Sequence, residues 1–221
     1  MKPLHDAGLM ETIIREVRDY SRKCFEGAMG SHDWEHTRRV HALCIRIGRV
    51  EGADLDVLEL AAYLHDIGRS QQDQAMGSLC HAIRGAETAR SLLEPLLGDR
   101  SMLDNIVHCI RSHRFRGDYA PQTLEAKVLF DADKLDSIGA VGVGRAFLFA
   151  GELGAALHDP EADPDSSQPY TRQDTAYREY RLKLRKIKDR MLTREGRRLA
   201  LERHAFMEEF FNRFLEEAAG L

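Results

Sequence analysis

The sequence predicts an all-α fold, a compact multi-helix bundle. Two observations support this prediction. Apolar residues return every three or four positions along most of the chain, which is the spacing of one helix face. No segment alternates apolar and polar residues with the period of two that is typical of half-buried strands. The length of 221 residues suits one domain over 1–221, with the functional motifs in 32–136 and C-terminal helices in 175–219 packed on them.

Glycine and capping residues separate the helices expected in the first half of the chain. Apolar spacing predicts a helix over 9–26 and a second helix that begins after Ser31-His32-Asp33, whose side chains suit an N-cap. Gly52-Ala53-Asp54 precedes a third helix, in which residues 58–64 are almost all apolar or small and are therefore expected to be buried. A polar stretch over 70–77 predicts a surface loop.

The second half of the chain continues the helical pattern. Helices are expected over 79–94, 102–110 and 124–129, each with an apolar face. Residues 141–157 are apolar and contain glycines that indicate close helix packing, namely Gly142, Gly144, Gly151 and Gly154. A last amphipathic helix carries an aromatic stripe, which predicts core packing or the surface of a homodimer, at Phe206, Phe210 and Phe214.

Two segments between these helices have an unusual composition. Residues 158–174 are rich in proline and aspartate and contain no aliphatic core residue, so they predict a disordered linker or a mobile lid near a site. Residues 178–198 contain ten basic residues against three acidic ones. This basic run predicts either a solvated helix face or a surface that attracts anions, and an apolar stripe within it supports the helix face. The stripe comprises Tyr180, Leu184, Ile187 and Met191.

Composition disfavours several classes of protein. The formal net charge of −4 gives no overall signature of nucleic-acid binding. The chain has no run of about 18 apolar residues, so no membrane span is expected. Four scattered cysteines predict small buried side chains in a reducing compartment rather than a disulfide framework. We therefore expect a cytoplasmic protein.

The strongest functional feature is the doublet His65-Asp66, which follows the expected buried helix. An imidazole nitrogen and a carboxylate oxygen stand side by side there, and burying such groups without partners is costly. A divalent metal would be one partner for both. The alternative is that His65 caps a helix end and Asp66 begins a turn, which Gly68 would allow. An isolated His-Asp pair is more often of this kind. The metal interpretation therefore depends on companions elsewhere in the chain.

Two companions complete a set of metal ligands. His36 follows His32 by one helical turn, and Asp131 comes after an apolar helical stretch, so its carboxylate can point inward. With His65 and Asp66 they offer two imidazoles and two carboxylates. Such a mixed nitrogen and oxygen set suits divalent Mn, Fe, Co, Ni or Zn. An octahedral ion with four protein ligands keeps two positions for water and substrate, which suits hydrolysis by metal-activated water.

The order His…His-Asp…Asp and its local contexts resemble the HD-domain superfamily of metal-dependent phosphohydrolases. The similarity covers most of the chain and is greatest with a bacterial and archaeal branch that includes nucleoside triphosphate pyrophosphohydrolases. It rests on segments 32–40, 64–67, 125–127, 131–140, 145–147 and 202–207. The resemblance implies that the metal ligands are His36, His65, Asp66 and Asp131. We also expect Asp66, Lys134 and His32 to be catalytic residues.

Some members of this superfamily bind a second metal through two further histidines between the doublet and the last aspartate. This chain offers His81, His108 and His113 in that interval, and the resemblance implies that His81 and His113 sit where those ligands would be. Each of them could instead be a satisfied polar residue at a helix end, so the number of ions stays open; Mg²⁺ is a further candidate for the second position. His81 departs from the nearer branch, where a small residue is common. The Gly-Tyr-Pro motif of the superfamily's cyclic-dinucleotide phosphodiesterases is absent.

Recognition of phosphate needs cations, and several lie near these motifs. Arg39, Arg114 and Arg116 could clamp phosphate oxygens in the forked geometry that arginine favours. Lys134 follows Asp131 by three residues and therefore shares a helix face with it. It either binds phosphate or neutralises the acidic cluster. His32 is expected to support the metal site or to carry a proton.

Together these features predict a metal-dependent phosphohydrolase that uses a metal-activated water on a nucleotide, as a (d)NTP pyrophosphohydrolase or a nucleotidase. One alternative is a cyclic-nucleotide or other phosphodiesterase. Another is a non-catalytic regulator that binds nucleotide or metal on the same scaffold. RNA or DNA binding through 178–198 is disfavoured, because that run lacks interleaved aromatic residues.

Overall fold

The computed structural model describes residues 7–26, 33–69, 80–114 and 119–221. All regular elements in these ranges are helices, with no strand among them, so the predicted all-α fold is confirmed. The polar stretch 70–77 and two predicted site residues, His32 and Arg116, lie outside the described ranges. Contacts divide the chain into two units, with the boundary between Ala132 and Asp133. Each unit is described by itself, and a single domain over 1–221 stays a prediction.

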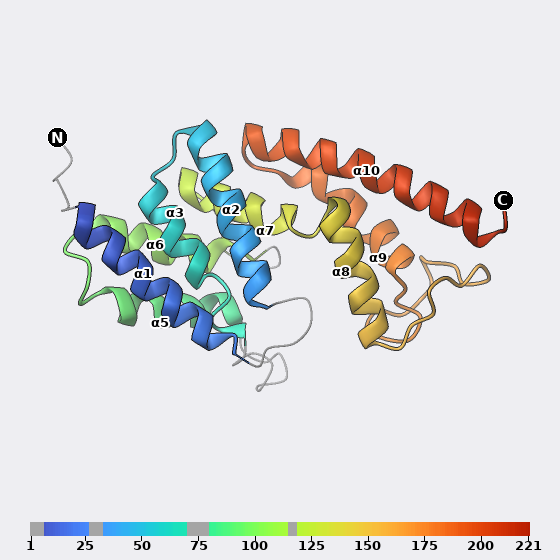
Figure 1. Cartoon of the computed structure of the whole chain (residues 1–221), viewed down its shortest axis with the longest axis horizontal. Helices are drawn as coiled ribbons and strands as arrows, with labels where there is room; N and C mark the ends of the chain where they lie inside the picture. The colour runs from blue at the N-terminus through green and yellow to red at the C-terminus, as the bar shows by residue number, and fades with distance from the viewer. Residues whose placement is uncertain (1–6, 27–32, 70–79, 115–118) are drawn as a thin grey trace. The chain divides into compact units, whose positions relative to one another are not determined.

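The first unit is built around the short helix α3 (Figure 1). α3 contacts four other helices, and all its residues from Val57 to Leu64 are buried except Glu59, which confirms the predicted core helix. Burying each of its large aliphatic side chains stabilises the fold by about 1.5–3 kcal/mol. The helices of this unit are α1 (Ala7–Cys24), α2 (Trp34–Glu51), α3 (Leu55–Leu64), α5 (His81–Leu93), α6 (Arg100–Ser112) and most of α7 (Leu124–Leu135).

Aspartate side chains determine where three of these helices begin. Asp33 accepts a hydrogen bond from His36 N at 2.8 Å, and Asp54 and Asp99 cap α3 and α6 in the same way. These bonds satisfy backbone N–H groups that have no partner inside the helix. α2 ends at Gly52, whose φ of +78° is a conformation that glycine adopts without strain. The predicted cap at Asp33 and the predicted break at 52–54 are confirmed.

The second unit contains the end of α7, then α8 (Gly139–Glu152), α9 (Ala176–Leu182), the 3₁₀-helix η1 (Leu184–Arg190) and α10 (Arg194–Ala218). α10 contacts α8 and η1. Phe211 of α10 is buried and stacks on Tyr180, with ring centroids 4.3 Å apart. Phe206 on the same helix is 44% exposed. The aromatic stripe is therefore partly core and partly surface, and its use in a homodimer stays a prediction.

Two expectations for this unit need correction. The basic run 178–198 is not one helix face, because its backbone passes from α9 through η1 into α10. Its apolar stripe is nevertheless largely buried, at Tyr180, Leu184 and Met191. Nor do all the glycines of 141–157 serve close packing. A Cβ added at Gly144 or Gly151 would meet no described atom within 4 Å, whereas one at Gly142 would lie 2.3 Å from Ser137 O.

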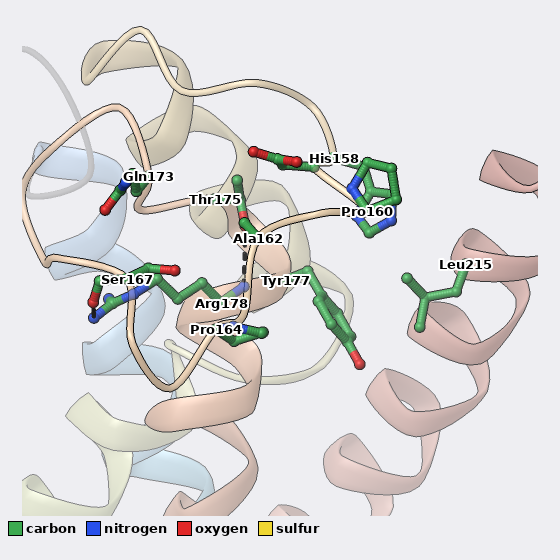
Figure 2. A pocket seen from close by; sticks show the side chains of 11 residues that line it. His158, Pro160, Ala162, Pro164, Ser167, Gln173, Thr175, Tyr177, Arg178 and Leu215 are labelled. Carbon is green, nitrogen blue, oxygen red and sulfur yellow. Dashed lines mark hydrogen bonds between the residues drawn. The ribbon is translucent and has the colours of Figure 1, made fainter.

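Residues 158–174 form a loop that is fastened to α9. Arg178, which is buried, donates from Nη1 to Asp174 Oδ1 and from Nη2 to Ser167 O, both at 2.7 Å. The loop, α9 and Leu215 of α10 surround a cavity of about 310 Å³ (Figure 2). The segment is therefore a structured loop rather than a disordered linker, and a function as a lid stays a prediction.

The four cysteines are free, as predicted. Cys44 and Cys109 are buried, but Cys24 and Cys80 are only half-buried, so the expectation that all four lie in the core is wrong for these two. In the part of the chain that the structure describes, no helix combines the length and the apolar character needed to cross a membrane.

Candidate metal centre

The buried carboxylate of Asp66 lies between two pairs of histidines. Its Oδ2 is 3.7 Å from His36 Nε2 and 3.8 Å from His65 Nε2. Its Oδ1 is 3.4 Å from His81 Nε2 and 3.5 Å from His113 Nε2. Within each group of three, which we call the first triad (with His36 and His65) and the second triad (with His81 and His113), the ligand atoms lie within 4.8 Å of one another. All five side chains are buried.

Helix ends deliver these side chains to one place. His36 lies in the first turn of α2, directly after the cap that Asp33 forms. His65 and Asp66 follow the last turn of α3, which confirms the predicted position of the doublet. In the second triad, His81 is the first residue of α5, and His113 is the C-cap of α6. The caps and breaks that end these helices therefore also position the site.

Gly68 brings α5 against the doublet. A Cβ at Gly68 would lie 2.4 Å from His81 O and 2.8 Å from Gly85 N, distances that real Cβ atoms essentially never show. On the facing side, a Cβ at Gly85 would lie 3.5 Å from His65 O. The turn after the doublet is confirmed. Its glycine is required by this close approach of two backbones, which places His81 beside Asp66.

Backbone carbonyls fix the protonation of one histidine in each triad. His65 Nδ1 lies 2.8 Å from Ala62 O, and His113 Nδ1 lies 2.6 Å from Ile110 O. Because a carbonyl oxygen only accepts, each Nδ1 carries the hydrogen, and in the neutral ring the Nε2 lone pair faces the triad. Metal-bound histidines commonly have this arrangement, with the other ring nitrogen held by a carbonyl or a carboxylate.

Imidazole nitrogens face each other within each triad. The Nε2 atoms of His36 and His65 are 3.4 Å apart, and those of His81 and His113 are 3.3 Å apart. Burial lowers the pKa of His81 to about 3, against the opposing effect of Asp66, so this ring is neutral near pH 7. A cation in each triad would satisfy the facing lone pairs. The imidazole and carboxylate donors therefore fit a divalent transition metal ion.

Two other predicted ligands belong to neither of these triads. Asp131 is completely buried on α7 but belongs to neither triad, so its role as a ligand stays a prediction from the family resemblance. His108, a candidate for a second metal, also belongs to neither triad. Its Nε2 accepts a hydrogen bond from Gln122 N at 3.0 Å. Of the three histidines that the sequence offers, the structure brings His81 and His113 together.

The predicted phosphate-binding residues have varied surroundings. Arg39 is half-buried on α2. Arg114 follows His113, and its Nη1 lies 3.3 Å from Cys80 Sγ. Lys134 belongs to the second unit and forms an ion pair of 2.6 Å with Asp133. The functions of these cations stay predictions.

The sequence analysis missed Arg69. Its Nη2 lies 3.3 Å from Asp66 Oδ1 and 3.2 Å from Asp66 Oδ2. The signal was available, because Arg69 follows Asp66 by three residues, a spacing that brings side chains together in a helical turn.

Comparison with known proteins finds a family domain that spans both triads. The HD domain model matches residues 33–138, a range that includes both triads. The chain is 33% identical over 210 residues to the uncharacterized protein YpgQ of Bacillus subtilis, across 93% of this chain and 94% of that protein. It also matches Ribonuclease Y of Chloroflexus aurantiacus, with 32% identity over 128 residues, which cover 58% of this chain and 22% of that protein.

Solved structures extend the similarity to the fold. The crystal structure of B. subtilis YpgQ in complex with ADP superposes with a TM-score of 0.74 and 30% identity, covering 95% of this chain and 96% of that one. A crystal structure of an HD-superfamily hydrolase from Bacillus thuringiensis gives a TM-score of 0.76 and 28% identity, covering 96% of this chain and 100% of that one.

Proposed function

The chain belongs to the HD-domain family, and we propose that it is a metal-dependent phosphohydrolase that acts on a nucleotide. The observation that carries the proposal is the position of Asp66, with one histidine pair facing each of its oxygens. Two similarities support it. One structural neighbour is an HD-superfamily hydrolase, and another, YpgQ, was crystallised with ADP.

In this proposal, the two triads hold divalent ions, with Asp131 as an additional ligand beside His36 and His65. Such ions would supply Lewis acidity and lower the pKa of a water molecule. Mn, Fe, Co, Ni or Zn fits the donor set. Mg²⁺ fits the second triad less well, because it prefers oxygen ligands and that triad offers two imidazoles and one carboxylate oxygen.

The chain's own groups orient the site and bind the substrate. Carbonyl oxygens hold His65 and His113 in the tautomer that presents Nε2 to an ion. Arg39, Arg114 and Arg116 are proposed to bind phosphate oxygens, which suit the planar fork of arginine. For Lys134 and His32 we keep the roles suggested by the sequence, phosphate binding and proton transfer.

A nucleoside triphosphate is the proposed substrate class, cleaved by a pyrophosphohydrolase or nucleotidase reaction. A phosphodiesterase is the second candidate, and the partial match to a ribonuclease supports it. A screen of NTPs, dNTPs, nucleoside monophosphates, cyclic dinucleotides and a single-stranded RNA, each with several divalent ions, separates the two. Turnover confined to phosphodiesters would overturn the triphosphate proposal. Nucleotide binding without turnover of any substrate would instead support the non-catalytic regulator.

The Asp66→Asn variant tests the proposal directly. The amide is a neutral and weaker donor, so both triads lose an anionic ligand. Bound metal, measured by elemental analysis, should fall, and kcat on the best substrate of the screen should fall about 100-fold or more, since residues that only support metal ligands already cost 10- to 100-fold.

A matched control is Asp104→Asn, which changes an exposed aspartate paired with Arg90. It should leave both the metal content and kcat unchanged. An Asp66→Asn protein with full metal and normal kcat would contradict the proposal. Full metal without activity would instead assign Asp66 to orienting the nucleophile.

A further inference from the structure

Arg69 contacts the carboxylate of Asp66, which the two triads share. One nitrogen, Nη2, contacts both Asp66 oxygens, at 3.3 and 3.2 Å. The backbone of Arg69 is fixed by its own hydrogen bond, from Arg69 N to Asp66 O at 2.9 Å. The side chain is 21% exposed, so it stands at the edge of the buried centre rather than inside it. Asp66 thus already has a cationic partner on both of its oxygens.

The guanidinium of Arg69 has donors to spare. A guanidinium carries five N–H groups in a planar fork. Among the described residues, the side chain of Arg69 contacts Asp66 through Nη2, and its buried Nε has no hydrogen-bond partner. A buried donor without a partner is costly. The arrangement therefore leaves donors of Arg69 for an acceptor that the described residues do not supply.

The charge of Arg69 also opposes the binding of metal. Like charges repel strongly in a partly buried site, where screening by water is weak. The positive charge of Arg69 already contributes to lowering the pKa of His81, so its field reaches the second triad. A divalent ion in either triad meets the same repulsion. A bound ion also neutralises part of the negative charge of Asp66, which weakens the attraction between this carboxylate and the guanidinium of Arg69.

We propose that Arg69 is a phosphate-binding residue that Asp66 holds until metal binds. Arg69 neutralises Asp66 in the metal-free protein and competes with divalent ions for it. In the metal-loaded protein the guanidinium turns its free donors to an anionic phosphate oxygen of the substrate. The metal-free role stands on the contacts of Arg69, whereas the substrate role rests on the proposed function.

Two binding constants measured on the full chain test this proposal. Mn²⁺ is titrated by isothermal calorimetry without any substrate, and inorganic phosphate is then titrated at saturating Mn²⁺. For Arg69→Ala we expect Mn²⁺ to bind about tenfold more tightly, because a competing charge is gone. We expect phosphate to bind about tenfold more weakly, because the fork is lost. A residue that merely supports the fold would weaken both constants.

Further variants separate charge from geometry. Arg69→Lys keeps the charge without the fork, so Mn²⁺ affinity should stay within about twofold while phosphate binding weakens. Arg69→Gln, which keeps a polar side chain, should tighten Mn²⁺ binding as alanine does, so poor folding of one variant does not decide the test. Arg84→Ala removes an arginine paired with Glu87 on the surface of α5 and should change neither constant.

Unchanged or weaker Mn²⁺ binding in both Arg69→Ala and Arg69→Gln would overturn the proposal. Unchanged phosphate affinity in these variants would overturn its substrate half. A wild-type protein that binds no Mn²⁺ or other divalent ion would overturn the proposed function together with this inference, and the wild-type titration alone reveals that outcome.

Discussion

At the scale of single residues, Gly68 positions a candidate metal ligand by having no side chain. Its Cα faces the backbone of the first turn of α5, and a Cβ would lie 2.4 Å from His81 O. Gly68→Ala must therefore push α5 away from the doublet. We expect the variant to lose about 1–3 kcal/mol of unfolding free energy, as overpacked sites do, and to bind metal more weakly at the second triad.

Gly98→Ala is the matched control. A Cβ at Gly98 would meet no described atom within 4 Å, and its φ lies outside the left-handed region. Alanine there should be neutral or slightly stabilising, because it restricts the unfolded chain. Urea unfolding in the presence of a chelator compares the two variants. If Gly68→Ala unfolds at the same urea concentration as Gly98→Ala, the close approach of the two backbones does not contribute to stability.

The residues of the candidate site differ in how well the sequence predicts them. His36, His65 and Asp66 were predicted together, because helix spacing and a doublet are local signals. The partners on the other side of Asp66 were named only as candidates. The family resemblance favoured the positions of His81 and His113, but their closeness to Asp66 depends on how α5 and α6 pack, and no local pattern contains that information.

At the scale of elements, Glu125 in the first turn of α7 joins two other helices. Asp54 N, at the start of α3, donates to Glu125 Oε1 at 2.9 Å. Asn105 Nδ2, on α6, donates to Glu125 Oε2 at 2.9 Å. α3 and α6 both run from this tie towards the triads, since their last turns precede His65 and His113. The tie therefore fixes how far two ligand-bearing helices are offset from each other.

We expect Glu125→Ala to destabilise the protein by about 1–3 kcal/mol, because it leaves two donors without their acceptor. Glu11→Ala, at an exposed glutamate of α1, is the control and should lie within about 0.5 kcal/mol of wild type. Urea unfolding with chelator present measures both. Equal unfolding midpoints for the two variants would show that the tie contributes nothing to stability.

Helices were predicted best where their ends carry a local signal. Asp33 and Gly52 mark the two ends of α2, and both act as the sequence indicated. The basic run 178–198 has an apolar stripe but no such signal inside it, so its division at η1 was not foreseen. The structure of the 158–174 loop was not foreseen either. Its structure depends on the buried contact between Arg178 and Asp174, which composition does not reveal.

At the scale of the whole molecule, the candidate centre belongs to the first unit alone. Its two triads bring together the ends of four helices that are separated in the sequence by loops of different lengths. The second unit has its own aromatic core and its own cavity. The homodimer and a cytoplasmic location stay predictions.

We expect Asp66 to lie between two cation sites. Crystals of the protein grown with Mn²⁺, with data collected at a wavelength where manganese scatters anomalously, test it most directly. We expect one anomalous peak between the Nε2 atoms of His36 and His65 and another between those of His81 and His113. A single peak beside His36 and His65 would refute the second triad. Anomalous peaks elsewhere, with none beside Asp66, would contradict the claim.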